Sequence, residues 1–169
     1  SIVSTNNGSV SVSGSTATYT PTTNYNGTDT FTYKANDGTG DSNTSTVTVT
    51  VAAVNDAPVT SNQTSSTIEN DGSKDITLAS TDVDGDSITY SIVSNVSNGS
   101  TSLSGSTVTY TPTADYVGTD TFTFKANDGI VDSNTSTVTI TITKENNKSI
   151  NFADVNGGHS YVHLPEIDS

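Results

Sequence analysis

The sequence predicts an all-β protein that consists of tandem antiparallel β-sandwich modules. Two observations carry this prediction. First, apolar residues alternate with Thr or Ser in several short runs, for example in residues 137–142 (TVTITI), 88–92 (ITYSI) and 122–124 (FTF). A period of two residues places the apolar side chains on one face of a strand, whereas no run follows the 3.6-residue period of a helix. Second, a long segment of the chain occurs twice.

The repeated segment sets the size of the module. Residues 9–51 align with residues 100–142 at a constant offset of 91, and 11 of the 43 aligned positions differ, which leaves 32 identical. The repeating unit is therefore about 90 residues long, which is the size of an immunoglobulin-like sandwich. Residues 54–90 have no counterpart ahead of residue 1. We therefore expect an incomplete first repeat at 1–52, a complete second repeat at 53–143 and a distinct tail at 144–169.

Turn residues divide the complete repeat into seven short runs with strand character. Seven strands separated by turns fit an immunoglobulin-like sandwich of two sheets. The first repeat would then supply only the last five of these strands, because it begins partway through the unit. The expected strands of the second repeat lie within 58–68 and at 74–80, 87–94, 100–103, 107–111, 120–126 and 134–142.

The composition excludes several classes of function. The chain has 18 acidic residues against 5 lysines, and its formal net charge is -13. Nucleic acid is therefore not an expected partner, because binding to its phosphates requires many basic residues. The absence of cysteine excludes a disulfide framework, a zinc–thiolate site and a thiol nucleophile. No apolar run reaches the ~20 residues of a membrane-spanning helix, so we expect no membrane insertion.

Acidic residues gather in segments that the sandwich topology brings to one pole. That pole holds the linker before the first strand, the loop between the second and third strands, and the loop between the sixth and seventh. Carboxylates that converge there repel each other, and a hard cation with about six to eight oxygen ligands relieves the repulsion. We therefore predict a calcium site where one module meets the preceding one. Its candidate ligands are Asn55, Asp56, Asp82, Asp84, Asp86 and Asp128.

A simpler interpretation of these acids stays open. Asp, Asn and Gly are also the residues that form tight turns, so the same segments could be turns without a metal.

Several motifs together resemble a known family. The chain resembles the bacterial immunoglobulin-like (cadherin-like) tandem repeat of large surface adhesins. The resemblance implies sandwich modules in tandem, on the cell surface or secreted and often calcium-dependent, that extend or anchor a larger protein, and it implies no enzyme. The motifs that carry it are residues 54–59 (VNDAPV), 82–86 (DVDGD), 109–112 (TYTP), 116–122 (YVGTDTF) and 127–129 (NDG).

The tail has two possible interpretations. Residues 149–152 (SINF) and 161–165 (YVHLP) are similar to the opening strand of laminin-G or concanavalin-like lectin domains. Alternatively, residues 148–157 (KSINFADVNG) match residues 74–85 (KDITLASTDVDG) with two positions deleted, which gives the tail the pattern of a second strand. A tail of this kind could add as a strand to the incomplete first repeat of another copy and so form a fibre.

No constellation for catalysis is present in the sequence. A base held against a nucleophile is required, and the only histidines are His159 and His163 in the tail. Carboxylate pairs can hydrolyse glycosides, but here they lie in loops at a module junction with no aromatic sugar platform. We therefore expect that the protein is not an enzyme.

These observations predict a structural role outside the cell. We expect a spacer or extender repeat of a bacterial cell-surface adhesin or extracellular filament, which calcium stiffens at the module junctions. Its partners would be the neighbouring repeats of the same protein. The alternatives are an adhesion module that binds a glycan or peptide on a surface, or a fibre subunit that polymerises by strand donation from the tail.

Overall fold

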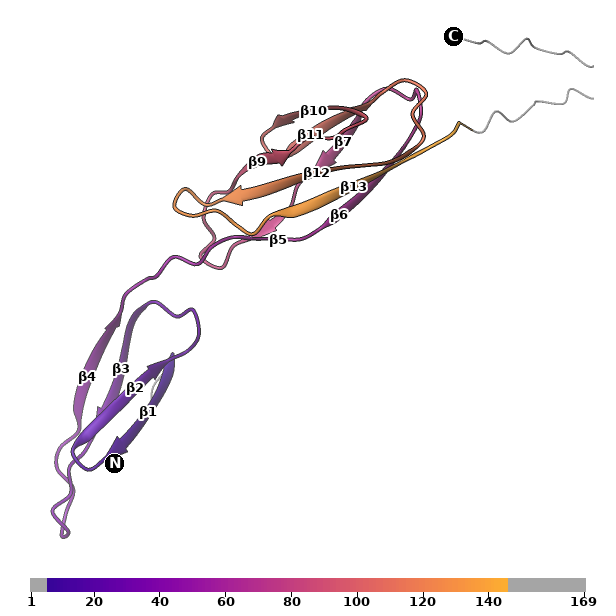
Figure 1. The fold of residues 1–169 in the computed structure, drawn as a ribbon. Coiled ribbons are helices and arrows are strands. Elements are labelled where there is room, and N and C mark those ends of the chain that lie inside the picture. Colours follow the sequence, from indigo (N-terminus) through magenta and orange to yellow (C-terminus); the bar gives the residue numbers. More distant parts are fainter. Residues whose placement is uncertain (1–5, 146–169) are drawn as a thin grey trace, which may run out of the picture.

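The computed structural model describes residues 6–145, which form thirteen β-strands and no helix. Figure 1 shows β1–β4 and β5–β13 as two separate groups of strands that are joined by the segment after β4. Nothing helical within 6–145 is long and apolar enough to cross a bilayer. The prediction of an all-β fold is therefore confirmed.

The first group contains two antiparallel pairs. Strand β1 (Gly8–Ser13) pairs with β2 (Thr16–Pro21), and β3 (Gly27–Tyr33) pairs with β4 (Ser45–Val51). Among its apolar side chains only Phe31 is buried, whereas Val47 and Val49 on β4 are half-buried. Within the described residues, the outer edge of β4 pairs with no other strand.

The second group is a sandwich of two larger sheets. One sheet has the order β10-β11-β7 and the other the order β6-β13-β12-β9, and β6 runs parallel to β13 while the other pairs are antiparallel. A further short pair joins β5 to β8. The strands are β5 (Val59–Thr60), β6 (Gln63–Ile68), β7 (Lys74–Thr77), β8 (Ser80–Thr81), β9 (Thr89–Ser94), β10 (Gly99–Ser104), β11 (Thr107–Pro112), β12 (Gly118–Asn127) and β13 (Ser136–Thr143).

Apolar residues alternate with polar residues along the strands, and the apolar side chains form the core between these sheets. Phe122 and Phe124 on β12 and Val138 and Ile140 on β13 are fully buried, and the Thr residues between them point to the other face. Burial of such side chains is the main favourable contribution to folding. The buried core cluster consists of Ile76, Leu78, Val108, Tyr110, Phe122, Phe124, Val138, Ile140 and Ile142.

The structure divides two of the expected strands. The run expected within 58–68 forms β5 and β6, and these pair with β8 and β13 in different sheets. Between them, the side-chain oxygen of Asn62 accepts the backbone N–H of Thr137 at 2.9 Å. The run expected at 74–80 also divides: residues 74–77 form β7, which pairs with β11, whereas Ser80 begins β8, which pairs with β5. The other five strands of this repeat lie within about two residues of their expected ends.

The two hypotheses for the tail concern residues that lie outside the described part of the chain, which ends at residue 145. They stay predictions, and so does the strand expected ahead of β1 in the first repeat.

Candidate metal centre at the module junction

The loop at 82–86 is organised around one carboxylate. Asp82 Oδ1 accepts the backbone N–H groups of Asp84 at 3.0 Å, Gly85 at 2.9 Å and Asp86 at 3.2 Å. The turn requires a left-handed backbone at Gly85, where φ is 78°. Asp82 therefore folds the loop around itself and keeps its second oxygen out of these bonds.

This loop gathers three acids within reach of a single ion. One carboxylate oxygen from each of Asp82, Asp84 and Asp86 lies within 4.8 Å of the other two. Asp82 Oδ2 is buried, and no hydrogen-bond donor of the described residues reaches it. An all-oxygen set with several carboxylates suits calcium, which prefers hard oxygen ligands in flexible loops. The residues present therefore fit the ion that the sequence analysis predicts.

The linker between the two groups of strands is bonded to this loop and to a second one. The N–H of Asp56 donates to Asp84 Oδ2 at 2.7 Å, and Asn55 Nδ2 donates to Asp128 Oδ2 at 2.8 Å. The structure thus brings the linker residues and both acidic loops together, although 73 positions separate Asn55 from Asp128.

Asp128 holds the linker and does not belong to the group of three acids. Its Oδ1 accepts the N–H groups of Ile130 and Val131, each at 2.7 Å, and its Oδ2 accepts the amide of Asn55. The hydrogen bond from Asn55, followed by those of the backbone, holds the pKa of Asp128 below its usual value despite burial. An ionised acceptor makes the bond to Asn55 stronger than a neutral one.

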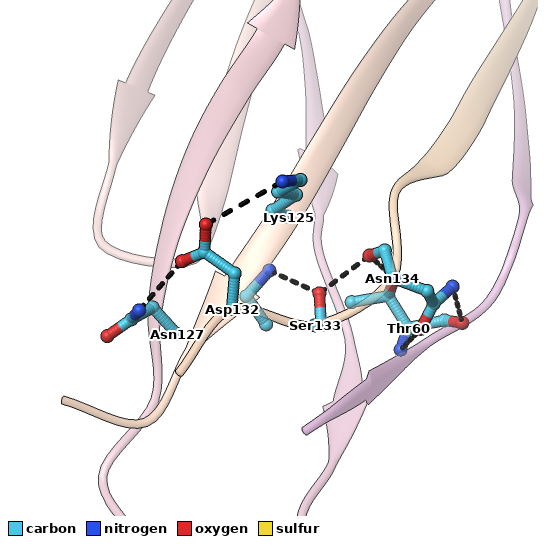
Figure 2. A network of polar contacts seen from close by, with 7 residues as sticks. Thr60, Lys125, Asn127, Asp132, Ser133 and Asn134 are labelled. Carbon is cyan, nitrogen blue, oxygen red and sulfur yellow. Dashed lines mark hydrogen bonds and ion pairs between the residues drawn. The ribbon is translucent and has the colours of Figure 1, made fainter. Parts of the chain in front are cut away.

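A third contact fixes the first strand of the sandwich to the loop at 126–136 (Figure 2). The side chain of Asn134 accepts the N–H of Thr60 and donates to its carbonyl, both at 3.0 Å. The hydroxyl of Thr60 donates to the carbonyl of Asn134 at 2.9 Å and lies 2.8 Å from Ser136 Oγ. Sequence analysis missed this contact, although the same residue types recur 91 positions earlier at Asn43 and Ser45.

Two buried acids were also missed. Asp120 on β12 accepts the N–H groups of Ser97 and Asn98, each at 2.9 Å, and the hydroxyl of Tyr110 at 3.2 Å. Asp29 on β3 accepts the N–H of Asn7 at 3.0 Å and the hydroxyl of Tyr19 at 2.9 Å. These carboxylates tie a loop and the opposite sheet to their strand, so their role is structural.

The pKa values of Asp29, Tyr19 and Tyr110 follow from burial and hydrogen bonding. Burial alone would raise the pKa of Asp29, but the hydrogen bonds from Tyr19 and from the backbone outweigh it, and the pKa is lowered. Burial, together with the neighbouring carboxylate, raises the pKa of Tyr19 and of Tyr110 to about 12. Both tyrosines therefore stay neutral donors over the whole physiological range.

A groove separates the two groups of strands at the junction. One side belongs to the turn between β2 and β3, and the other belongs to the linker and the acidic loop. The lining residues are Pro21, Thr22, Thr23, Asn24, Tyr25, Asn26, Val51, Ala52, Val54, Asp56 and Asp84.

Known structures share this fold at low sequence identity. The EC1–2 fragment of human mucin-like protocadherin aligns with a TM-score of 0.52 and 16% identity over 80% of this chain and 78% of that one. Extracellular cadherin domains 1–5 of protocadherin gamma B2 align with a TM-score of 0.52 and 18% identity over 86% of this chain and 32% of that one. At such identities the likeness concerns the fold alone.

Two other comparisons add nothing to the assignment of the fold or the family. An endo-fucoidan hydrolase of glycoside hydrolase family 107 aligns with a TM-score of 0.43 and 17% identity over 93% of this chain. This chain spans only 25% of the length of that hydrolase. None of the curated proteins matches the sequence.

A family model gives the most specific assignment. The model of the bacterial Ig domain matches residues 1–50 and again residues 55–141, so it covers most of the chain and both copies of the repeat. The gap between the two matches, residues 51–54, directly precedes Asn55 and Asp56, which are bonded to the acidic loops. The chain therefore belongs to the bacterial Ig domain family.

Proposed function

We propose that the protein is a spacer segment of an extracellular bacterial adhesin or filament, and that calcium at the module junction stiffens it. One observation carries the proposal. The linker donates hydrogen bonds to two acidic loops of the following module, and one of these loops places three carboxylates within 4.8 Å of each other. The proposed role is mechanical rather than catalytic.

The residues that would hold calcium are Asp82, Asp84 and Asp86. The ion would supply positive charge against three carboxylates that otherwise repel each other. Lys125 forms an ion pair with Asp132 at 3.6 Å, away from the three acids. No lysine within residues 6–145 forms an ion pair with the three acids, and their repulsion opposes the compact loop.

Calcium binding to the loop at 82–86 would affect the linker through Asp84. Asp84 accepts the N–H of Asp56 and also belongs to the group of three acids. An ordered Asp84 keeps this acceptor in place, and the backbone of the linker is then fixed relative to the second module. Buried Pro58, at the end of the linker, further restricts the backbone because its φ is fixed.

Thermal unfolding of the whole chain in calcium and in EDTA tests this proposal. Calcium that binds only the folded state stabilises the protein by about 2.7 kcal/mol when its free concentration is a hundred times its dissociation constant. We expect a higher midpoint in calcium, and we expect Asp84→Asn and Asp86→Asn to abolish the increase. Asp75→Asn on β7 removes the same charge outside the junction and should keep it.

Two outcomes would overturn the proposal. Equal midpoints in calcium and in EDTA would reduce the acidic loop to an ordinary turn. Long polymers in sedimentation under both conditions would favour strand donation from the tail, since that mechanism needs no calcium.

A further inference from the structure

Asparagine precedes glycine at four places in the chain, namely at residues 7–8, 26–27, 98–99 and 156–157. The first three lie in the part of the chain that the structure describes. Asparagine is thermolabile, and most so before glycine, because glycine has no side chain to shield its backbone nitrogen from the amide carbon of the asparagine. The reaction also requires rotation of the backbone, so the fold determines which pair reacts.

Two of these pairs occupy equivalent positions in the two repeats, and hydrogen bonds hold both. The N–H of Asn98 donates to Asp120 Oδ2 at 2.9 Å, and the carbonyl of Asn98 accepts the N–H of Thr113 at 2.9 Å. The N–H of Asn7 donates in the same way to Asp29 Oδ2 at 3.0 Å. In each pair the glycine is the first residue of a strand. Rotation of the backbone would break these bonds, so both pairs are protected.

The third pair is open to solvent. Asn26 and Gly27 are exposed, and Asn26 lies just ahead of β3. Within residues 6–145 no hydrogen bond fixes the side chain of Asn26. The equivalent position in the second repeat is Val117, which is 49% exposed, so a complete repeat also leaves this position accessible.

The fold requires the glycine of this pair. Gly27 has a φ of 121° and the equivalent Gly118 a φ of 150°, both in the region that favours glycine. A Cβ atom would lie 3.5 Å from the hydroxyl of Tyr25 at Gly27, and only 2.8 Å from the hydroxyl of Tyr116 at Gly118. Both repeats therefore keep this glycine. The residue before it differs, because the second repeat has Val where the first has Asn.

Asn26 lies at the module junction. It lines the groove between the two groups of strands on the side of the turn between β2 and β3, and Asp56 and Asp84 line the opposite side. Asn24 lines the same side as Asn26, but it precedes Tyr25, whose bulk hinders the same reaction. A negative charge at position 26 would therefore add to the acids of the junction.

We propose that Asn26 deamidates spontaneously and thereby adds an acid to the module junction. The backbone nitrogen of Gly27 attacks Cγ of Asn26, a bond forms between them, and the bond from Cγ to Nδ2 breaks. Nδ2 leaves as ammonia and takes up the amide proton of Gly27. Water then opens the cyclic imide at one of its two carbonyls. The product is Asp or isoaspartate at position 26, and the chain gains one negative charge.

The consequence of this reaction rests on the proposed calcium site. A carboxylate brings charge that an amide lacks, and the charge of the ligands is one of the properties that set calcium affinity. The new acid belongs to the first module, whereas Asp84 on the opposite side of the groove belongs to the second. We therefore expect the junction to bind calcium more tightly as the protein ages.

Peptide mapping by mass spectrometry tests where the chain reacts. The whole chain is incubated in EDTA at mildly alkaline pH, and the mass increase from amide to acid is followed at each pair. We expect Asn26 to convert about tenfold faster than Asn7 and Asn98, because these two react only after local opening of the fold. Asn26→Val, which copies the second repeat, should remove the fast phase. Equal rates at the three pairs, or a fast phase that persists in Asn26→Val, would overturn the proposal.

Calorimetric titration with calcium chloride tests the consequence. We expect Asn26→Asp to lower the dissociation constant about fivefold relative to the wild type. Asn95→Asp adds the same charge at an exposed position of the second repeat and should change it less than about twofold. Unchanged affinity of Asn26→Asp, or an equal gain in Asn95→Asp, would overturn the effect on the junction. Absence of calcium binding in every form would refute the calcium site and this effect, whereas the rates in EDTA still decide the reaction at Asn26.

Discussion

Asn55 Nδ2 lies 2.8 Å from Asp128 Oδ2, so the residue that begins the linker contact is bonded to a loop 73 positions further along the chain. This bond joins the entry of the second module to the loop between its last two strands. It determines where the linker lies before any ion is considered.

Replacement of Asn55 by Asp should weaken the junction. The change removes the N–H donor and places a second carboxylate beside Asp128, which is itself ionised. We expect a lower unfolding midpoint for Asn55→Asp in EDTA. Asn95→Asp adds the same charge at an exposed position and keeps the acceptor for Thr101, so it should have little effect. An equal decrease in both variants would show that net charge, and not the contact, is responsible.

The loop at 126–136 recurs at 35–45 in the first repeat, so the equivalent Asn side chain can be truncated in both loops. Asn134→Ala removes both bonds to the buried backbone of Thr60, and we expect a loss of about 2 kcal/mol in the free energy of unfolding. Asn43→Ala removes the equivalent side chain from the loop at 35–45 and should lower the free energy of unfolding by less than about 0.5 kcal/mol. Denaturant unfolding of the two variants measures both values. Equal losses would contradict the role assigned to the Thr60 contact.

Two glycines should respond differently to Ala. At Gly99 a Cβ atom would lie 2.5 Å from the carbonyl oxygen of Thr111 and 2.7 Å from the ring of Tyr110, whereas at Gly40 it would meet nothing within 4 Å. Overpacking of this kind costs about 1–3 kcal/mol, so Gly99→Ala should destabilise the fold while Gly40→Ala stays within about 0.5 kcal/mol. Thermal unfolding distinguishes them, and a neutral Gly99→Ala would show that strand β10 can move away.

Stability should fall at alkaline pH. The pKa of Tyr110 is raised from 10.0 to about 12 in the folded state, first by burial and then by Asp120. Because the folded pKa is higher, the stabilisation is fully present below pH 10 and is lost as the pH rises towards 12. Denaturant midpoints of the wild type and of Tyr110→Phe at pH 9 and pH 11 measure this. The difference between the pH values should be smaller in the variant, and equal differences would exclude Tyr110 as the cause.

The sequence predicted the strands better than the contacts between them. Period-two alternation located β13, where apolar residues alternate with Thr along the strand, and β12, where they do so at residues 121–124. The division of the first strand into β5 and β6 was not predicted, because it depends on the side chains of Asn62 and Asn134, which bond to backbone groups far away in sequence.

The candidate site was predicted in part for a similar reason. Strand polarity alone places the linker and the two acidic loops at one pole, and the structure brings Asn55 to Asp128 and Asp56 to Asp84. The buried Asp120 was missed although it is in phase with Phe122 on the same strand, a spacing that places it on the inner face. Asp120 lies between two Thr residues in the sequence, which made its inward spacing hard to recognise.

The central claim is that calcium fixes one module relative to the next. The chain contains no cysteine, so single Cys residues can be introduced at exposed strand positions such as Thr48 on β4 and Thr141 on β13. Pulsed electron paramagnetic resonance between spin labels at these two sites then reports the spread of distances across the junction. We expect one narrow distribution in calcium that broadens in EDTA and stays broad for Asp84→Asn in either condition. A distribution of the same width with and without calcium would contradict the account.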